Sequence, residues 1–476
     1  MLGSQQILTF PILFPIMSTM KPTPSQLHLP LSDFDSSEPL EKGQKRVVNG
    51  YINRMDPRDK AFHHWYRFVL SFPPHLVSNY ISDFGLDGRH VILDPFCGTG
   101  TTLVESKLRG IRTIGIEANI FAHFASSVKV DWEIDPDLLK KGARKIADST
   151  LGLLKAQGID DSRLLKGRLK EVTLRTLDPE ATKLLLSNSI SPLPLHKTLI
   201  LLDCLRKDQS EPYYRHALLA LANALVFRIS NLHFGPEVGV GKPKTDVPVV
   251  ATWLSEIERI ANDLTLVANK SFPISRVYLG DARNVSKIIQ PNSVDTVITS
   301  PPYPNEKDYS RTTRLESVVL GFIKSKPELR EMKRTFIRSN TRSVYKDDED
   351  DKWVVGHPEI QRIAASIEKR RTELRKNSGF ERLYGKVTRL YFGGMARHLA
   401  DLRSALRPGA KLAYVVGDQA SYLRIMIHTG QLLADMAQAL GYELMRIDLF
   451  RTRYATATRE QLREEVVVLR WPGRKR

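Results

Sequence analysis

The chain has 476 residues, of which 42% are hydrophobic, and it carries 71 lysines and arginines against 53 aspartates and glutamates. This length and apolar content predict a folded protein with a substantial core, built as one enlarged domain or as two. A formal charge of +18 and a pI near 9.7 favour a nucleic-acid partner, although a basic surface that is merely solvated gives the same figures. Only two cysteines, Cys97 and Cys204, are present, which excludes a disulfide framework and a four-thiolate zinc site and fits a reducing, cytoplasmic compartment.

Residues 1–45 begin with an apolar stretch, Ile7 to Met17, that two prolines interrupt. No basic segment precedes this stretch, and it is far shorter than a helix that spans a bilayer, so we expect neither a secretion signal nor a membrane anchor. We interpret residues 1–45 as a disordered N-terminal arm, with Met17 and Met20 as alternative translation starts.

The first chemical signal lies in residues 46–130, where an apolar strand ends in the segment Asp94 to Thr102, with the sequence DPFCGTGTT. Its two glycines allow a tight turn and a close approach of a ligand to the backbone, although such a pair is also typical of an ordinary strand-to-helix turn. The next strand ends at Glu117, where a doubly wound fold places an acid for ribose hydroxyls. Leu103 stands where a dinucleotide fingerprint has its third glycine, so a nucleoside without a pyrophosphate is the better ligand.

Two segments interrupt the alternation of strands and helices. Residues 131–270 are rich in leucine and alanine at helical spacing, which predicts a mostly helical insertion and a candidate for target recognition. Residues 311–390 are rich in basic side chains and are a candidate nucleic-acid contact. Arg370, Arg371 and Arg375 are the residues expected to carry this contact, although such charge runs are often solvated helix faces.

The second chemical signal lies in residues 271–310, where an apolar strand ends in Ser300-Pro301-Pro302-Tyr303. The two prolines fix the backbone and remove two donors, so that nearby carbonyls face outward as acceptors, while the tyrosine offers a ring face. This arrangement suits an amino group on a flat base, although proline pairs also occur in rigid turns without a function.

Strand-like apolar runs with helical patterns between them recur along the chain. They predict an α/β fold with a doubly wound, mostly parallel sheet that helices cover on both faces, and a ligand site at the carboxyl ends of the strands. The runs end at Asp94, Glu117, Asp281, Ser300, Asp418 and Trp471, the last two of them within residues 391–476.

Together, the segments Asp94 to Thr102 and Ser300 to Tyr303 resemble the FxGxG and (Asp/Asn/Ser)-Pro-Pro-(Tyr/Phe) motifs of the amino-methyltransferase family of DNA modification enzymes. The resemblance covers roughly half of the chain and extends, more weakly, to Ser71 to Leu76. It implies a Rossmann-like methyltransferase sheet with an antiparallel last strand, and S-adenosyl-L-methionine as the cofactor. Glu117 would bind the ribose and Asp281 would lie by the adenine. The residues that the resemblance implies for cofactor binding are Asp94, Pro95, Phe96, Gly98, Gly100, Thr101, Glu117 and Asp281.

The resemblance also implies that Ser300, Pro301, Pro302 and Tyr303 are catalytic. Acceptor oxygens of Ser300 and Pro301 would hold the amino hydrogens of a base flipped out of double-stranded DNA, and Tyr303 would stack on that base. Serine at the first position resembles the cytosine-N4 members, so methylation of cytosine N4 is favoured and methylation of adenine N6 is the alternative. No Pro-Cys dipeptide is present, which excludes C5 methylation of cytosine by a cysteine nucleophile.

Other functions remain open at this point. Related enzymes use similar proline-proline motifs to methylate RNA or protein amides, and a DNA-binding protein with a decayed catalytic motif is a third class. We expect a monomer that binds double-stranded DNA without a metal or a membrane, and that works alone or beside a separate cognate restriction endonuclease.

Overall fold

The computed structural model describes residues 60–67, 71–161, 172–234, 238–305, 307–454 and 461–473. The N-terminal arm expected for residues 1–45 lies outside the described residues. None of the described helices is both long and apolar enough to cross a membrane.

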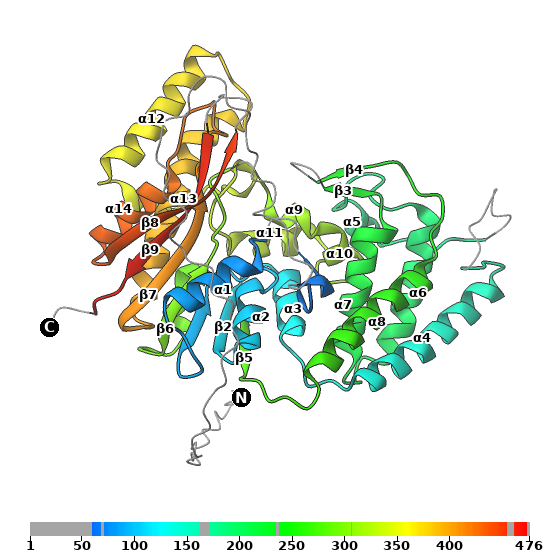
Figure 1. The fold of residues 1–476 in the computed structure, drawn as a ribbon. Coiled ribbons are helices and arrows are strands. Elements are labelled where there is room, and N and C mark those ends of the chain that lie inside the picture. Colours follow the sequence, from blue (N-terminus) through cyan, green and yellow to red (C-terminus); the bar gives the residue numbers. More distant parts are fainter. Residues whose placement is uncertain are drawn as a thin grey trace, which may run out of the picture. The chain divides into compact units, whose positions relative to one another are not determined.

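The centre of the fold is a seven-stranded sheet with the strand order β5-β2-β1-β6-β7-β9-β8 (Figure 1). Neighbouring strands from β5 to β7 run parallel, whereas β9 lies between β7 and β8 and runs antiparallel to both. The expected α/β fold, a mostly parallel Rossmann-like sheet with an antiparallel last strand, is therefore confirmed. The strands are β1 (Val91–Asp94), β2 (Arg112–Glu117), β5 (Ser275–Leu279), β6 (Val294–Thr299), β7 (Leu406–Gly417), β8 (Glu443–Tyr454) and β9 (Gln461–Arg470).

Helices cover both faces of this sheet, which explains why its central strands are almost continuously apolar. Ile92 and Leu93 are neighbours on β1, and both are completely buried, but they belong to different cores because successive strand side chains point to opposite faces. Ile92 shares a core with α1 (Pro74–Asp83) on one face. Leu93 shares a core with α13 (Tyr384–Leu402) and α14 (Thr429–Ala439) on the other.

The edge strand β8 is not revealed by the apolar runs of the sequence. Apolar and polar side chains are mixed along it, with Arg446, Arg451 and Arg453 among them, and none of its described side chains is fully buried. A half-exposed strand at the edge of a sheet produces this weaker pattern, whereas the strands that were predicted are continuous apolar runs. The difference matters because β8 contributes to the site described below.

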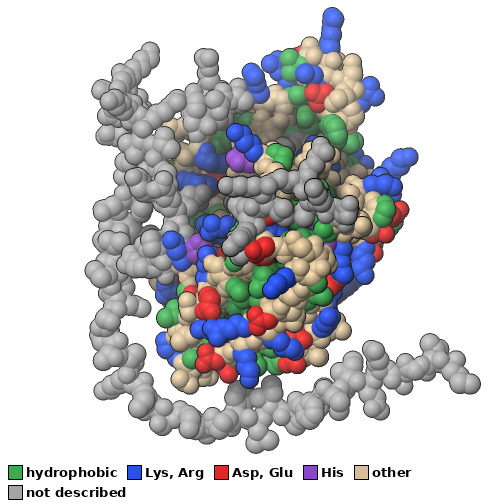
Figure 2. Space-filling model, turned by 90° about the vertical axis from the view of Figure 1, so that its right-hand side faces the viewer, with side chains coloured by type: hydrophobic (Ala, Val, Ile, Leu, Met, Phe, Trp, Pro, Cys, Tyr) green, Lys and Arg blue, Asp and Glu red, His purple; other side chains and the backbone are tan. Residues whose placement is uncertain are grey.

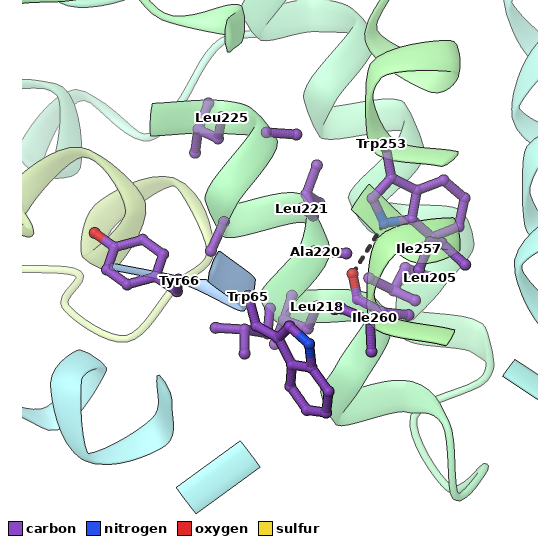
Figure 3. Close-up of a cluster of buried hydrophobic side chains, with 14 of the residues drawn as sticks. Trp65, Tyr66, Leu205, Leu218, Ala220, Leu221, Leu225, Trp253, Ile257 and Ile260 are labelled. Carbon is purple, nitrogen blue, oxygen red and sulfur yellow. Dashed lines mark hydrogen bonds between the residues drawn. The ribbon is translucent and has the colours of Figure 1, made fainter. Parts of the chain in front are cut away.

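The helical insertion follows α3 (Ile120–Lys129) and packs into one large core with it. Trp253 lies at the centre of this core and donates a hydrogen bond from Nε1 to the Ala217 carbonyl at 2.9 Å (Figure 3). Trp65 and Tyr66, which precede the sheet in sequence, fill the same core. The insertion contains α4 (Pro136–Ala156), α5 (Pro179–Thr182), α6 (Pro192–Lys207), α7 (Tyr214–Ala224), a π-helix (Leu225–Ile229), the hairpin of β3 (Leu232–Phe234) and β4 (Val238–Val240), and α8 (Val249–Val267).

The charged insertion between β6 and α13 contains α9 (Tyr309–Thr312), α10 (Arg314–Val319), α11 (Lys326–Arg334) and α12 (Pro358–Glu373). Many of its basic side chains have acidic partners close by in the same insertion. These pairs are Arg334–Asp347, Arg338–Asp348, Arg370–Glu373 and Arg371–Glu368, at 2.6, 2.7, 3.4 and 2.6 Å. Figure 2 shows the same mixture of basic and acidic side chains over the face that it presents, with Lys and Arg projecting at the top, where α12 lies in Figure 1.

Candidate active site

A cavity of about 560 Å³ opens at the carboxyl ends of four parallel strands. The residues just beyond β1, β2, β5 and β6 line it, namely Pro95, Ala118, Gly280 and Ser300. Among the residues that the sequence indicated, the cavity is lined by Pro95, Phe96, Gly98, Thr101, Glu117, Asp281, Ser300, Pro301, Pro302 and Tyr303. Asp94 and Gly100 do not line it. The fold thus brings the two sequence motifs, which are far apart in the chain, to one cavity.

The glycine loop, residues 95–100, joins β1 to α2 (Thr101–Leu108) through a tight turn in which the Gly100 N–H donates to the Cys97 carbonyl at 2.7 Å. Gly98 and Gly100 have φ values of +51° and +83°, a region that favours glycine. A Cβ on Gly100 would lie 3.1 Å from Cβ of Ser126, whereas a Cβ on Gly98 would meet nothing within 4 Å. Gly100 therefore serves packing, and Gly98 leaves open space at the cavity wall.

Asp94 is buried beneath the glycine loop and ties the two motifs together. Its Oδ1 accepts hydrogen bonds from the Thr299 hydroxyl at 2.6 Å and from the Phe96 N–H at 3.1 Å. Burial raises the pKa of Asp94 to about 6. Because Thr299 is the last residue of β6, the Asp94 carboxyl fixes the start of the Ser300 to Tyr303 segment relative to the glycine loop.

Glu117 stands at the end of β2, and its two carboxylate oxygens accept from different backbone N–H groups. Oε2 accepts from Gly98 and Oε1 from Asn119, both at 2.8 Å. Burial is the main cause that raises the pKa of Glu117 to about 7, and the nearby Asp94 charge adds to it. Each oxygen keeps a further lone pair, so the side chain can still accept from two hydroxyl groups.

Asp281 lines the cavity just after β5, but its carboxylate is already held by Arg283. The Arg283 Nε lies 3.0 Å from Oδ1 of Asp281, and the Arg283 Nη2 lies 2.7 Å from Oδ2. Arg283 also pairs with Asp350 at 2.5 Å, and Asp350 pairs with Arg397 of α13 at 3.2 Å. The carboxylate of Asp281 is therefore part of a buried ionic chain that joins the sheet to the charged insertion.

The segment Ser300 to Tyr303 lines the same cavity as the glycine loop. The Ser300 hydroxyl donates to the Val415 carbonyl at 3.2 Å, which leaves the hydroxyl oxygen available as an acceptor. The Tyr303 ring lies against Gly417 at the end of β7. A Cβ added to Gly417 would be 3.1 Å from Cε2 of Tyr303. Burial, with the Glu464 charge as a second cause, raises the pKa of Tyr303, so its hydroxyl stays protonated at neutral pH.

Strands β8 and β9 add a charged wall that the sequence motifs did not indicate. Glu464 of β9 pairs with Arg451 of β8, and also with Arg453 of β8 at 3.2 Å; all three residues line the cavity. The i, i+2 spacing of the two arginines places them on one face of a strand, so recognising β8 would have revealed them. Further cavity residues without a sequence signal are Asn305, Tyr309, Phe336, Ile337, Ser339, Gln419 and Phe450.

The weaker resemblance at Ser71 to Leu76 divides into two parts in the structure. Ser71, Phe72 and Pro73 line the cavity, whereas Leu76 is buried in the core that α1 forms with the sheet. The first part is therefore placed to contact a ligand, and the second stabilises the fold.

Comparisons with known proteins agree with this geometry. Residues 36–126 match the DNA methylase family of N6 and N4 methyltransferases. The chain is 25% identical to the type II methyltransferase M.BsoBI of Geobacillus stearothermophilus in an alignment of 465 positions that covers 91% of this chain and 88% of that protein. It is 23% identical to the type II methyltransferase M.AvaI, as found in Nostoc sp. (strain PCC 7120 / SAG 25.82 / UTEX 2576) and in Anabaena variabilis, over 91% of this chain and 90% of each relative. Both sequence motifs lie at one cavity of a Rossmann-like sheet, and the family match and these relatives support an assignment of the chain to the amino-methyltransferase family of DNA methylases.

Proposed function

We propose that this protein is a site-specific DNA methyltransferase that transfers a methyl group from S-adenosylmethionine to N4 of a flipped-out cytosine. The observation that carries the proposal is the single cavity that joins the glycine loop and Glu117 to the segment Ser300 to Tyr303. A cofactor-binding wall and a base-binding wall in one cavity are what direct transfer between two bound molecules requires.

The residues of the first wall fit S-adenosylmethionine. A volume of about 560 Å³ is of the size that binds small ligands. The open space at Gly98 would be filled by a side chain on any other residue, so a ligand can approach the backbone there. Glu117 has two acceptor oxygens for the ribose hydroxyls, and methyltransferases of this family use S-adenosylmethionine in general. Pro95, Phe96 and Thr101 complete this wall, and the ionic chain from Asp281 to Arg283 keeps its far end rigid.

The second wall positions the base. The oxygen of Ser300 and the carbonyl of Pro301 would accept the two amino hydrogens, which favours a nitrogen lone pair directed at the methyl donor. S-adenosylmethionine supplies an electrophilic methyl group, so that the bond from nitrogen to carbon forms as the carbon–sulfur bond breaks and its electron pair stays on sulfur. One amino proton is then released, and no covalent bond to the protein is needed. Pro302 fixes the backbone, and Tyr303 provides the stacking surface.

Cytosine is favoured over adenine by the chemistry of position 300 and of Arg453 on strand β8. Ser300 offers a single neutral acceptor oxygen, where a carboxylate would offer two charged ones. Arg453 lines the same cavity and can donate to N3 and O2 of cytosine, whereas adenine has a C–H group where cytosine has O2. Adenine N6 shares the exocyclic amino group and is the alternative substrate.

The relatives support a proposal about the biological system in which this chain acts. M.BsoBI and M.AvaI are named type II methyltransferases, and by analogy we propose that this chain modifies a short DNA site as part of a restriction-modification system. The enzyme would act as a monomer, with any endonuclease as a separate protein. We further propose that residues 131–270 read the target and that residues 311–390 contact the DNA backbone, outside their internal ion pairs.

The test is methylation in vitro, with labelled S-adenosylmethionine, of duplex DNA and of total RNA. The methylated nucleic acid is digested to nucleosides and analysed by mass spectrometry. We expect N4-methylcytosine from DNA and no labelled RNA. N6-methyladenine alone would overturn the choice of base and keep the enzyme class, while label in RNA alone would overturn the choice of substrate.

A further inference from the structure

Lys129 is the last residue of α3, and its side chain is buried with 1% exposure. A buried lysine normally needs a carboxylate or several acceptors, because its ammonium group loses water. Lys129 Nζ lies 2.8 Å from the Thr99 carbonyl and 3.2 Å from the Tyr66 carbonyl. Burial lowers the pKa of Lys129 to about 7. In either protonation state the amine has at least two N–H donors, enough for these two carbonyls.

The first of these carbonyls lies inside the glycine loop. The peptide group between Thr99 and Gly100 is held at both ends, since its N–H donates to the Cys97 carbonyl at 2.7 Å and its carbonyl accepts from Lys129. The orientation of this peptide group fixes the turn in which Gly98 and Gly100 take positive φ values. Thr99 lines the cavity, so Lys129 holds the cofactor wall from behind without lining the cavity itself.

The second carbonyl belongs to the segment that precedes the sheet. The hydroxyl of Tyr66 donates to the carboxyl of Glu316 in α10, which is fully buried. The chain that follows Tyr66 reaches Ser71, Phe72 and Pro73, which line the cavity. Lys129 therefore joins the glycine loop to the base of a segment on another part of the cavity wall.

We infer that Lys129 is a positioning residue for S-adenosylmethionine binding, acting through the Thr99 carbonyl of the glycine loop. The inference rests on the proposed function, because it concerns the cofactor wall of the same cavity. Removing the amine would take from both buried carbonyls the hydrogen bond that Nζ donates, and the peptide group between Thr99 and Gly100 would keep its N–H bond to Cys97 but lose this bond at its carbonyl end. The loop would then no longer be preorganised for its ligand.

The test compares Lys129→Met with Lys107→Met. Lys107 is also buried, with 7% exposure, and also donates to a carbonyl, that of Val130 at 2.7 Å, but it does not contact the glycine loop. Calorimetry gives the Kd of S-adenosylmethionine, steady-state kinetics gives the KM for duplex DNA, and thermal melting reports the structural damage. For Lys129→Met we expect a Kd at least about tenfold higher, with the KM for DNA within about twofold of wild type. For Lys107→Met we expect a similar loss of thermal stability and a Kd within about twofold of wild type.

Lys129→Gln keeps amide donors on a shorter side chain and should give a Kd between those of wild type and Lys129→Met. It also serves as the test variant if Lys129→Met does not fold. If Lys129→Met binds S-adenosylmethionine with wild-type affinity, the inference about Lys129 is overturned and the proposed function is not. The same holds for Lys129→Gln if it is the variant that folds. Equal losses of affinity in Lys129→Met and Lys107→Met would reduce Lys129 to a purely structural residue and would also overturn it. A wild-type chain that binds no S-adenosylmethionine would overturn the proposed function together with this inference.

Discussion

The two walls of the cavity are built in different ways. The proposed cofactor wall comes mainly from residues 94–119, one strand-loop-helix-strand unit in which the glycine loop bonds to the end of β2, through Cys97 N–H to the Ile116 carbonyl and Gly98 N–H to Glu117. The base wall starts from Ser300 to Tyr303 but is completed by β7, β8 and β9, which lie more than a hundred residues further along the chain. A local unit can be read from a short motif, whereas a wall assembled from distant strands cannot.

This difference makes the two walls separable by mutation. A change in the cofactor wall should alter the affinity for S-adenosylmethionine and leave the DNA interaction intact, while a change in the base wall should do the reverse. The variants below test this separation, starting with the largest expected effect.

Tyr303→Ala should lower the rate of methyl transfer about tenfold to a hundredfold, because the stacking surface for the flipped base is lost. The Kd of S-adenosylmethionine should stay within about twofold of wild type. Tyr303→Phe is the control, since it keeps the ring and should retain most of the activity. Single-turnover kinetics and calorimetry measure the two quantities. A large loss of cofactor affinity in Tyr303→Ala would show that the walls are not separable.

Glu117→Gln should raise the Kd of S-adenosylmethionine about tenfold at pH 8, because one acceptor oxygen for the ribose is replaced by a donor. The raised pKa of about 7 adds a pH dependence: in the wild type, affinity should weaken as the pH falls below about 7, where the carboxyl takes up its proton. Glu117→Gln should show no such dependence. A wild-type affinity that is flat between pH 6 and 8 would contradict this role of Glu117.

The same raised pKa has the opposite consequence for the stability of the ligand-free protein. Because the folded state binds the Glu117 proton more tightly than the unfolded state, this contribution to the free energy of unfolding is present at low pH and is lost as the pH rises through about 7. The difference between wild type and Glu117→Gln in urea unfolding, measured from pH 5 to 8, checks this sign.

Gly417→Ala should reduce methyl transfer by several-fold, because the new methyl group would press on the Tyr303 ring at 3.1 Å and on Cγ of Glu464 at 3.2 Å. Its backbone φ is not positive, so strain in the main chain is not expected. Gly152→Ala in α4 is the matched control, since a Cβ there meets nothing within 4 Å and should leave activity unchanged. Wild-type activity in Gly417→Ala would mean that the position of the ring is not critical.

The smallest effects are expected outside both walls, on α12 and just beyond it. Arg370 and Arg371 already pair with Glu373 and Glu368, whereas Lys369 and Arg375 have no acidic partner within 4 Å among the described residues. Replacing Lys369 and Arg375 by Ala should weaken DNA binding about twofold to threefold and flatten its salt dependence. Replacing Arg370 and Arg371 by Ala should change the affinity for DNA less. Identical binding in both double variants, measured by fluorescence anisotropy over a salt series, would place the DNA contact on another surface.

The sequence by itself determined the fold class and indicated the residues of the proposed cofactor wall. Continuous apolar runs that end in Asp94, Glu117 and Ser300 are enough to predict a parallel sheet with a site at its carboxyl edge, because both faces of such strands are buried. The glycine loop was predictable because its two glycines with positive φ values stand in the motif itself, whereas the support from Lys129 was not visible in the motif.

Only the tertiary structure decided the rest. It brought Arg451, Arg453 and Glu464 to the cavity that Tyr303 lines, because β9 lies between β7 and β8 and its Glu464 pairs with both arginines of β8. It also paired Asp281 with Arg283 and much of the basic insertion with its own acids, which a count of charges does not reveal. The physical reason is common to all of these cases. A local motif fixes a local backbone shape, but which side chains meet across a fold depends on strand order and packing, and those depend on the whole chain.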